Sequence, residues 1–260
     1  MAVSSQSFDR AASFYDRTRG LSADAAVRVT ELLTGELTGR GRCLEIGVGT
    51  GRIAWPLHEA GVTMTGIDLS RPMMRVLVEK AGGRVPFPLA QADATILPFP
   101  DHRFGAAVAS HVFHLIPDWR QALTEVTRVV RPGGVFLSSR GGRDRQGALA
   151  AVRAEFQARL GGDAVHVGAT HAGGDVEDAL AGLGAQERPL PVVHATHTTT
   201  VGDMIDSLEA GQWSWAWGIP EARLREVADH TREWARSRFG PLEEPVTFEY
   251  EVPWRAFDVP

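Results

Sequence analysis

The feature that most constrains the fold of this chain is a glycine loop that follows a short apolar run near position 45. The run Arg42–Ile46 reads RCLEI, glycine then returns at Gly47, Gly49 and Gly51, and a helical pattern covers Arg52–Ala60. A buried strand that turns through glycines into a helix lets the backbone approach a ligand closely and points helix N–H groups at it. The sequence therefore predicts a ligand-binding α/β fold.

Short apolar runs alternate with helical patterns along the first two thirds of the chain, which is typical of a parallel α/β sheet. Strands are predicted at Arg42–Ile46, Val62–Ile67, Pro88–Ala92, Phe104–Ala109, Val135–Ser139 and Gln186–Thr198. Helices are predicted at Arg52–Ala60, Arg71–Lys80, Ala148–Leu160 and Asp175–Leu183, and also after the capping residues Asp118 and Thr200 and from Pro220 onward. Strict alternation of apolar and polar residues from Val246 to Trp254 predicts a half-covered antiparallel strand at the sheet edge.

Acidic residues stand at the ends of three predicted strands. Glu45 precedes the glycines, where it would oppose a pyrophosphate but suits a ligand that carries positive charge. A dinucleotide fingerprint would need a third glycine at position 52, which is Arg52, so a nicotinamide dehydrogenase is disfavoured. Asp68 can accept the hydroxyls of an adenosine ribose, and Asp93 can accept from an adenine amine. Each glycine alone can serve a turn and each acid alone can cap a helix. The glycine loop, Asp68 and Asp93 occur in order at the carboxyl ends of three predicted strands, and together they favour a nucleoside site.

Several longer segments resemble one known family, the class I S-adenosylmethionine-dependent methyltransferases, and most closely the small-molecule group related to ubiquinone-type methyltransferases. These segments are CLEIGVGTGR (Cys43–Arg52), GIDLS (Gly66–Ser70), QADATILPFPD (Gln91–Asp101) and the run Val108–Ser139. The resemblance covers Phe8 to Ser139 and extends to the remainder only by architecture. It implies a Rossmann-like, doubly wound, mostly parallel seven-stranded sheet with an antiparallel final strand and helical cap insertions. The implied cofactor is S-adenosylmethionine, with S-adenosylhomocysteine as its product.

The resemblance also implies a division of the chain. Residues 1–260 are expected to form a single methyltransferase domain, with its core at about 36–140, 174–200 and 243–256. An N-terminal lid helix is expected at about 7–34. Cap insertions are expected at about 144–170 and 201–240, above the carboxyl edge of the sheet.

Cofactor contacts follow from the resemblance residue by residue. The backbone of Gly47, Gly49 and Gly51 would pass beneath the cofactor's amino acid and ribose, Glu45 would orient this loop and the methionyl amine, and Asp68 would take the ribose hydroxyls. The remaining implied contacts are Leu69 and Met73 on the adenine, Asp93 and Ala94 at its edge, Ser110 and His111 at the methionyl part, Tyr15 as a cover and Arg19 as a partner of the carboxylate. An ordinary surface helix is the alternative for Tyr15 and Arg19.

Methyl transfer from a sulfonium requires the protein mainly to align the nucleophile, to exclude water and in some cases to accept a proton. His111 and His114 are the candidate catalytic bases, because imidazole titrates near neutral pH; packed histidines at a strand–helix junction are the alternative. The side chains Met204, Trp213, Trp215 and Trp217 are predicted to form an acceptor pocket for an apolar or aromatic molecule, or else to fill the core of the cap or a dimer contact. No metal-ligand spacing stands out, so no metal site is predicted.

The composition of the chain limits the kinds of molecule that it is expected to bind. The net charge is −5, which argues against nonspecific binding of nucleic acid or an anionic membrane. A single cysteine excludes a disulfide framework, and no apolar run approaches the ~18 residues of a membrane span. We therefore expect a cytoplasmic monomer or homodimer that methylates a small molecule. The alternatives are a non-catalytic module that binds the cofactor or its product, and a protein or nucleic-acid methyltransferase.

Overall fold

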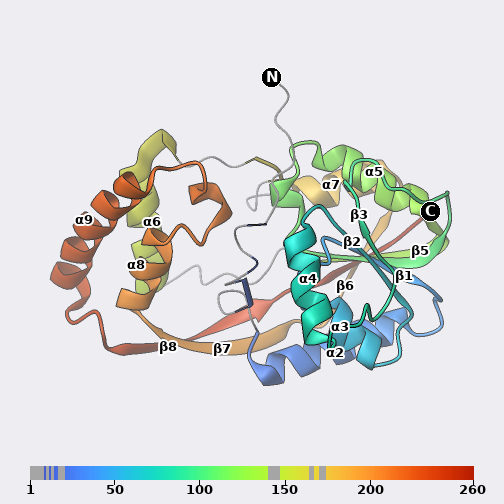
Figure 1. Cartoon of the computed structure of the whole chain (residues 1–260), viewed down its shortest axis with the longest axis horizontal. Helices are drawn as coiled ribbons and strands as arrows, with labels where there is room; N and C mark the ends of the chain where they lie inside the picture. The colour runs from blue at the N-terminus through green and yellow to red at the C-terminus, as the bar shows by residue number, and fades with distance from the viewer. Residues whose placement is uncertain are drawn as a thin grey trace. The chain divides into compact units, whose positions relative to one another are not determined.

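A computed structural model describes residues 9, 12, 15–16, 21–139, 147–163, 167–169 and 174–260 of the chain. The chain divides into two compact units (Figure 1). The first unit comprises residues 1–141, 167–193 and 252–260, and the second comprises 142–166 and 194–251. Within the described ranges, no helix combines the length and the apolar character that crossing a bilayer requires.

The first unit is built on a seven-stranded sheet in the order β3-β2-β1-β4-β5-β9-β6. Its strands are β1 (Cys43–Ile46), β2 (Met64–Asp68), β3 (Leu89–Gln91), β4 (Phe104–Ser110), β5 (Val130–Ser139), β6 (Gln186–Pro189) and β9 (Arg255–Asp258). The first five strands pair in parallel, while β9 runs antiparallel to both β5 and β6. The strand order reverses between β1 and β4, so the predicted doubly wound sheet is confirmed and its switch point lies beside the glycine loop.

Helices cover both faces of this sheet (Figure 1). On one side lie α2 (Ala23–Leu37), α3 (Ala54–Glu59) and α4 (Arg71–Lys80), and on the other α5 (Trp119–Val129) and α7 (Asp175–Gly182). The predicted cap of α5 is confirmed, since the Asp118 carboxylate accepts from the backbone N–H of Gln121. The helix after the glycine loop begins only at Ala54, so Pro56 lies in its first turn, where its missing N–H breaks no bond.

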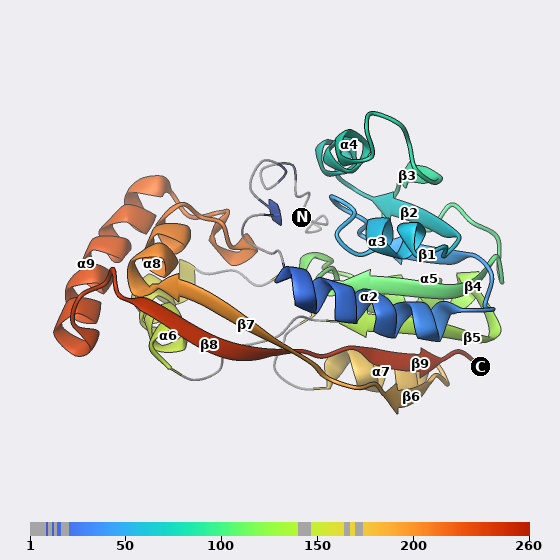
Figure 2. The ribbon, with the colours of Figure 1, turned by 90° about the horizontal axis from the view of Figure 1, so that it is seen from below.

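The carboxyl-terminal strands correct two predictions. The strand expected at Gln186–Thr198 is broken into β6 and β7 (Val193–Thr200). The strand expected at the sheet edge is β8 (Pro245–Val252), which instead pairs with β7 in a separate two-stranded sheet (Figure 2). The main sheet receives β9 in its interior, between β5 and β6. Successive residues Ala256 and Phe257 are both buried, as a strand covered on both faces requires.

The second unit packs α6 (Ala148–Leu160), α8 (Val201–Glu209) and α9 (Glu221–Phe239) around an apolar core of its own. Short 3-10 turns follow α6 at Gly161–Asp163 and precede α9 at Ser214–Ala216. The predicted capping box of α8 is confirmed, because the Thr200 hydroxyl accepts from Asp203 N–H while the Asp203 carboxylate accepts from Thr200 N–H.

In the first unit, Glu125 and Arg128 of α5 hold the segment that leads from β3 to β4. The Glu125 carboxylate accepts from the backbone N–H of Leu97 (2.7 Å) and pairs with Arg128 (2.7 Å). Arg128 in turn donates to the Phe99 carbonyl (2.8 Å) and the Asp101 carboxylate (2.7 Å). The segment that carries the predicted adenine contacts is thereby fixed to a helix of the core.

We expect Glu125→Gln to lower the free energy of unfolding by about 2 kcal/mol, because charge-assisted bonds are lost at a buried position. The Arg128 hydrogen bond holds the pKa of Glu125 below its usual value. This stabilisation is present above the unfolded pKa and is lost as the pH falls through the lower folded pKa. Urea unfolding at several pH values measures both effects. The exposed partner change Asp101→Asn should cost clearly less than Glu125→Gln, and an equal cost for both variants would contradict the assignment.

Candidate active site

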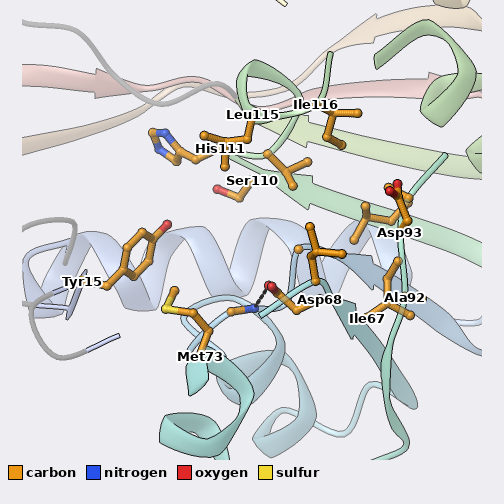
Figure 3. Close-up of a pocket in the computed structure, with 16 residues that line it drawn as sticks. Tyr15, Ile67, Asp68, Met73, Ala92, Asp93, Ser110, His111, Leu115 and Ile116 are labelled. Carbon is orange, nitrogen blue, oxygen red and sulfur yellow. Dashed lines mark hydrogen bonds between the residues drawn. The ribbon is translucent and has the colours of Figure 1, made fainter. Parts of the chain in front are cut away.

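The carboxyl ends of β1, β2 and β4 meet at a hollow of about 650 Å³, part of which is open to solvent (Figure 3). The carboxyl ends of the strands at a switch point are where open α/β sheets bind their ligands. The hollow is lined by Tyr15, Ile46, Gly47, Gly49, Ile67, Asp68, Leu69, Met73, Ala92, Asp93, Ala94, Ser110, His111, Val112, Leu115 and Ile116. Residues from five parts of the sequence thus converge at the switch point of the sheet.

The glycine loop approaches the hollow as bare backbone. Gly47 and Gly49 have φ angles of 69° and 52°, a region that side chains rarely adopt. A Cβ atom on Gly47 would come within 2.5 Å of the Val112 side chain, and one on Gly51 would clash with Leu77 of α4. Gly51 therefore serves packing and does not line the hollow, whereas Gly47 and Gly49 line it, and a Cβ atom on either would press on another lining side chain, Val112 or Met73.

Asp68 holds the loop and faces the hollow at the same time (Figure 3). One carboxylate oxygen accepts from Gly49 N–H (2.8 Å) and the other from Ser70 N–H (2.7 Å). Burial raises the pKa of this carboxyl group, and the backbone hydrogen bonds partly oppose that rise. The result is a fixed carboxylate with lone pairs left for hydroxyl donors in the hollow.

The predicted adenine contacts line the same hollow. Leu69 follows β2, Met73 lies in the first turn of α4, and Ala94 follows β3. The Asp93 carboxylate accepts from the backbone N–H and the hydroxyl of Thr95, both at 2.9 Å, which fixes its orientation. In Figure 3, Asp93 lies toward one end of the hollow and Tyr15 with Met73 toward the other, with Asp68 between them.

Glu45 is buried at 2% exposure and does not line the hollow. Burial raises the pKa of this carboxyl group well above its usual value, while the charge of Arg52 and the N–H of Ala54 act in the opposite direction. Its Oε2 atom has no hydrogen-bond partner among the described residues. The carboxyl group therefore lies inside the fold, at the base of the glycine loop.

Ser110 and His111 line the hollow at the end of β4. Ser110 accepts a hydrogen bond from the Arg52 guanidinium (3.0 Å). His111 has a φ angle of 57°, in the left-handed region, and its N–H donates to the Ser139 carbonyl (3.0 Å). A histidine held there carries strain of order 1–3 kcal/mol, a feature that clusters at functional sites. His114 lies in the following 3-10 turn (Phe113–Leu115) and does not line the hollow.

Tyr15 lines the hollow, while Arg19 lies outside the described residues. The lining residues that sequence reasoning did not identify are apolar: Ile46, Ile67, Ala92, Val112, Leu115 and Ile116. In the sequence they belong to ordinary strand and helix patterns, so no signal separates them from core residues.

The predicted acceptor residues lie in the second unit. Trp215 is buried in its core, with Met204 and Trp213 packed against that core. The Trp213 and Trp215 rings are 6.5 Å apart, and Phe156 contacts Trp215 at 6.3 Å. Trp217 ends the same 3-10 turn. Trp215 thus has a core role, and an acceptor role for this group stays a prediction.

Comparison with known proteins agrees with this geometry. Residues 44–138 match the family model of a methyltransferase domain. The chain is 41% identical over 128 residues to a phosphatidylethanolamine N-methyltransferase of Cereibacter sphaeroides, a match that covers 46% of this chain and 62% of that one. It is 38% identical over 96 residues to a demethylmenaquinone methyltransferase of Thermus thermophilus, which covers 36% and 44%. The chain spans less than two thirds of either relative.

A solved structure shares the fold over nearly the whole chain. It is the Haemonchus contortus phospholethanolamine N-methyltransferase 2 in complex with phosphomonomethylethanolamine and S-adenosylhomocysteine. The TM-score is 0.57 at 15% identity, over 97% of this chain and 57% of that one. Residues 44–138, which hold the glycine loop and the strand-end acids, are therefore similar to the methyltransferase-domain family and to the methyltransferases named above.

Proposed function

We propose that the protein binds S-adenosylmethionine in the hollow at the switch point and transfers its methyl group to a small apolar or aromatic acceptor. The observation that carries this proposal is the Asp68 carboxylate, fixed by Gly49 and Ser70 inside a hollow lined by bare glycine backbone. An adenosine ribose offers two adjacent hydroxyl donors to such a group. The match of residues 44–138 to the methyltransferase-domain family supports the same cofactor.

The residues present fit this cofactor. Gly47 and Gly49 present bare backbone to the hollow, which permits close approach of the cofactor. Asp68 would hold the ribose, Asp93 and Ala94 the adenine edge, and Leu69 and Met73 the adenine face. The apolar residues Ile67, Leu115 and Ile116 would exclude water from the adenine.

S-adenosylmethionine supplies a methyl group already activated by a positively charged sulfur. The residues of this chain then have to align the acceptor and receive its proton where the reacting group carries one. His111 lies at the hollow with its backbone fixed by Ser139, so its imidazole is the candidate base. His114 lies in the 3-10 turn that follows His111 and does not line the hollow, so it would act on the acceptor only indirectly.

Two observations support a small apolar or aromatic molecule as the methyl acceptor. The relatives are named for phosphatidylethanolamine and for demethylmenaquinone, which are both small molecules. Trp213 and Trp217, which are half-buried in the second unit, would offer aromatic surface to such a molecule, whereas Trp215 fills the core of that unit.

Isothermal titration with S-adenosylmethionine, S-adenosylhomocysteine and NAD tests the proposal. We expect micromolar binding of the first two and at least hundredfold weaker binding of NAD, because the loop lacks the third glycine of a dinucleotide site. A preference for NAD would overturn the proposal. Release of S-adenosylhomocysteine in the presence of demethylmenaquinone or phosphatidylethanolamine vesicles then tests turnover. Cofactor binding with neither acceptor methylated, even when aromatic small molecules are added, would favour the non-catalytic module.

A further inference from the structure

Two carboxylates of the N-terminal segment contact the rim of the cofactor hollow. Asp9 accepts from the Ser70 hydroxyl at 2.5 Å, and Ser70 is a fully buried residue that caps α4 and donates its N–H to Asp68. Asp16 accepts from the hydroxyl of Thr50, the residue between Gly49 and Gly51, at 2.7 Å. The two acids thus contact the two loops, after β2 and after β1, that contribute lining residues to the hollow.

Lys80 completes the second of these contacts. Its ammonium group lies 2.6 Å from the other carboxylate oxygen of Asp16 and 3.0 Å from the backbone carbonyl of Thr50. The amine stands in the last turn of α4, where the helix dipole favours positive charge. Lys80, Asp16 and Thr50 therefore form a closed triangle, in which each member bonds to the other two.

The triangle is tied directly to the hollow on two sides. Tyr15, the neighbour of Asp16 in the same short helical stretch, lines the hollow. Thr50 is 1% exposed and follows Gly49, whose N–H donates to Asp68. Lys80 does not itself line the hollow, but its contacts connect it to Tyr15 and to the glycine loop, which do.

We propose that Lys80 is a positioning residue for the cofactor hollow, which holds Tyr15 in place through Asp16 and fixes the glycine loop through the carbonyl of Thr50. This inference rests on the proposed cofactor. A compact ammonium with three donors suits the task, since it serves a carboxylate and a carbonyl that converge on one point. The wider planar fork of arginine does not match that geometry.

Lys80→Met tests the inference, because methionine keeps an unbranched side chain and removes the charge. We expect about tenfold weaker binding of S-adenosylhomocysteine by isothermal titration, and turnover at saturating cofactor within threefold of the wild type. The matched control is Asp24→Asn, which removes an exposed ion pair with Arg28 on α2 and should leave affinity unchanged. Unchanged affinity in Lys80→Met would overturn the inference. Failure of the wild type to bind S-adenosylhomocysteine would instead overturn the proposed function.

A double-mutant cycle separates positioning from general destabilisation. If Lys80 acts partly through Tyr15, the affinity losses of Lys80→Met and Tyr15→Ala should be less than additive, because the second change removes what the first one holds. Asp16→Asn combined with Lys80→Met should behave in the same way. Fully additive losses in both cycles would contradict the assignment.

The sequence offers a chemical test as well, because Lys80 is the only lysine of the chain. Acetylation of amines removes the charge at Lys80, whereas reductive dimethylation keeps it; both also modify the N-terminal amine. We expect acetylation to weaken S-adenosylhomocysteine binding about tenfold and dimethylation to weaken it less, because the dimethylated amine keeps its charge but only one of its three N–H donors. In Lys80→Arg only the N-terminal amine reacts, so acetylation should have no effect there. Equal effects of the two reagents on the wild type would count against a role of the charge.

Discussion

Asp68→Ala is expected to weaken binding of S-adenosylhomocysteine by 100-fold or more. The substitution removes the carboxylate that would accept two ribose hydroxyls, and charge-assisted hydrogen bonds of this kind contribute about 1.5–3 kcal/mol each. It also frees the backbone N–H groups of Gly49 and Ser70, which now donate to Asp68 at 2.8 and 2.7 Å. Isothermal titration measures the loss directly.

A ligand change separates the ribose contact from loosening of the loop. The wild type should bind S-adenosylhomocysteine far more tightly than its 2′-deoxy analogue, and Asp68→Ala should bind the two about equally. Affinity should also fall as the pH is lowered through the raised pKa of Asp68, because only the ionised carboxylate accepts both hydroxyls. Binding by Asp68→Ala within threefold of the wild type, with the fold intact by thermal unfolding, would show that Asp68 does not contact the ribose.

His111→Asn is expected to lower turnover by 10²- to 10³-fold at neutral pH, while the affinity for S-adenosylhomocysteine changes less than threefold. A positioned general base contributes a factor of about 10²–10⁴. Asparagine is the informative substitution, because it tolerates the left-handed conformation that His111 adopts at φ 57°. The free energy of unfolding should therefore change by less than about 1 kcal/mol. The measurement is release of S-adenosylhomocysteine, with demethylmenaquinone or phosphatidylethanolamine vesicles as the acceptor.

His114→Asn is the matched control, since His114 lies nearby but does not line the hollow. It should retain turnover within threefold. With the cofactor kept saturating, so that the effect of Asp68 on affinity is removed, the acidic limb of the pH–turnover profile should be present in the wild type and in His114→Asn and lost in His111→Asn. Equal turnover of His111→Asn and the wild type would leave His111 with a structural role only.

The sequence alone was sufficient to predict where the central residues of the candidate site lie in the fold. Gly47, Gly49, Asp68 and Asp93 each follow a strand pattern that is readable locally. Parallel strands bring their carboxyl ends to one edge, so strand-end residues converge without any knowledge of the remaining chain. The bounds of α4 and α6 were predicted for the same reason, since a helix of 10 or 13 residues carries its own apolar stripe and stop signals.

The tertiary structure decided the features that depend on contacts between residues far apart in the sequence. The pattern from Val246 to Trp254 fixes a strand, but its pairing with β7 and the entry of β9 between β5 and β6 depend on which faces other elements cover. Similarly, no local pattern distinguishes Leu115 of the hollow from a core leucine, or shows that Lys80 reaches Asp16 across 64 positions to 2.6 Å. Local sequence sets the conformation of each segment and which of its faces is apolar. The contacts between segments come from packing the whole chain, in which burial and hydrogen bonding must be satisfied together.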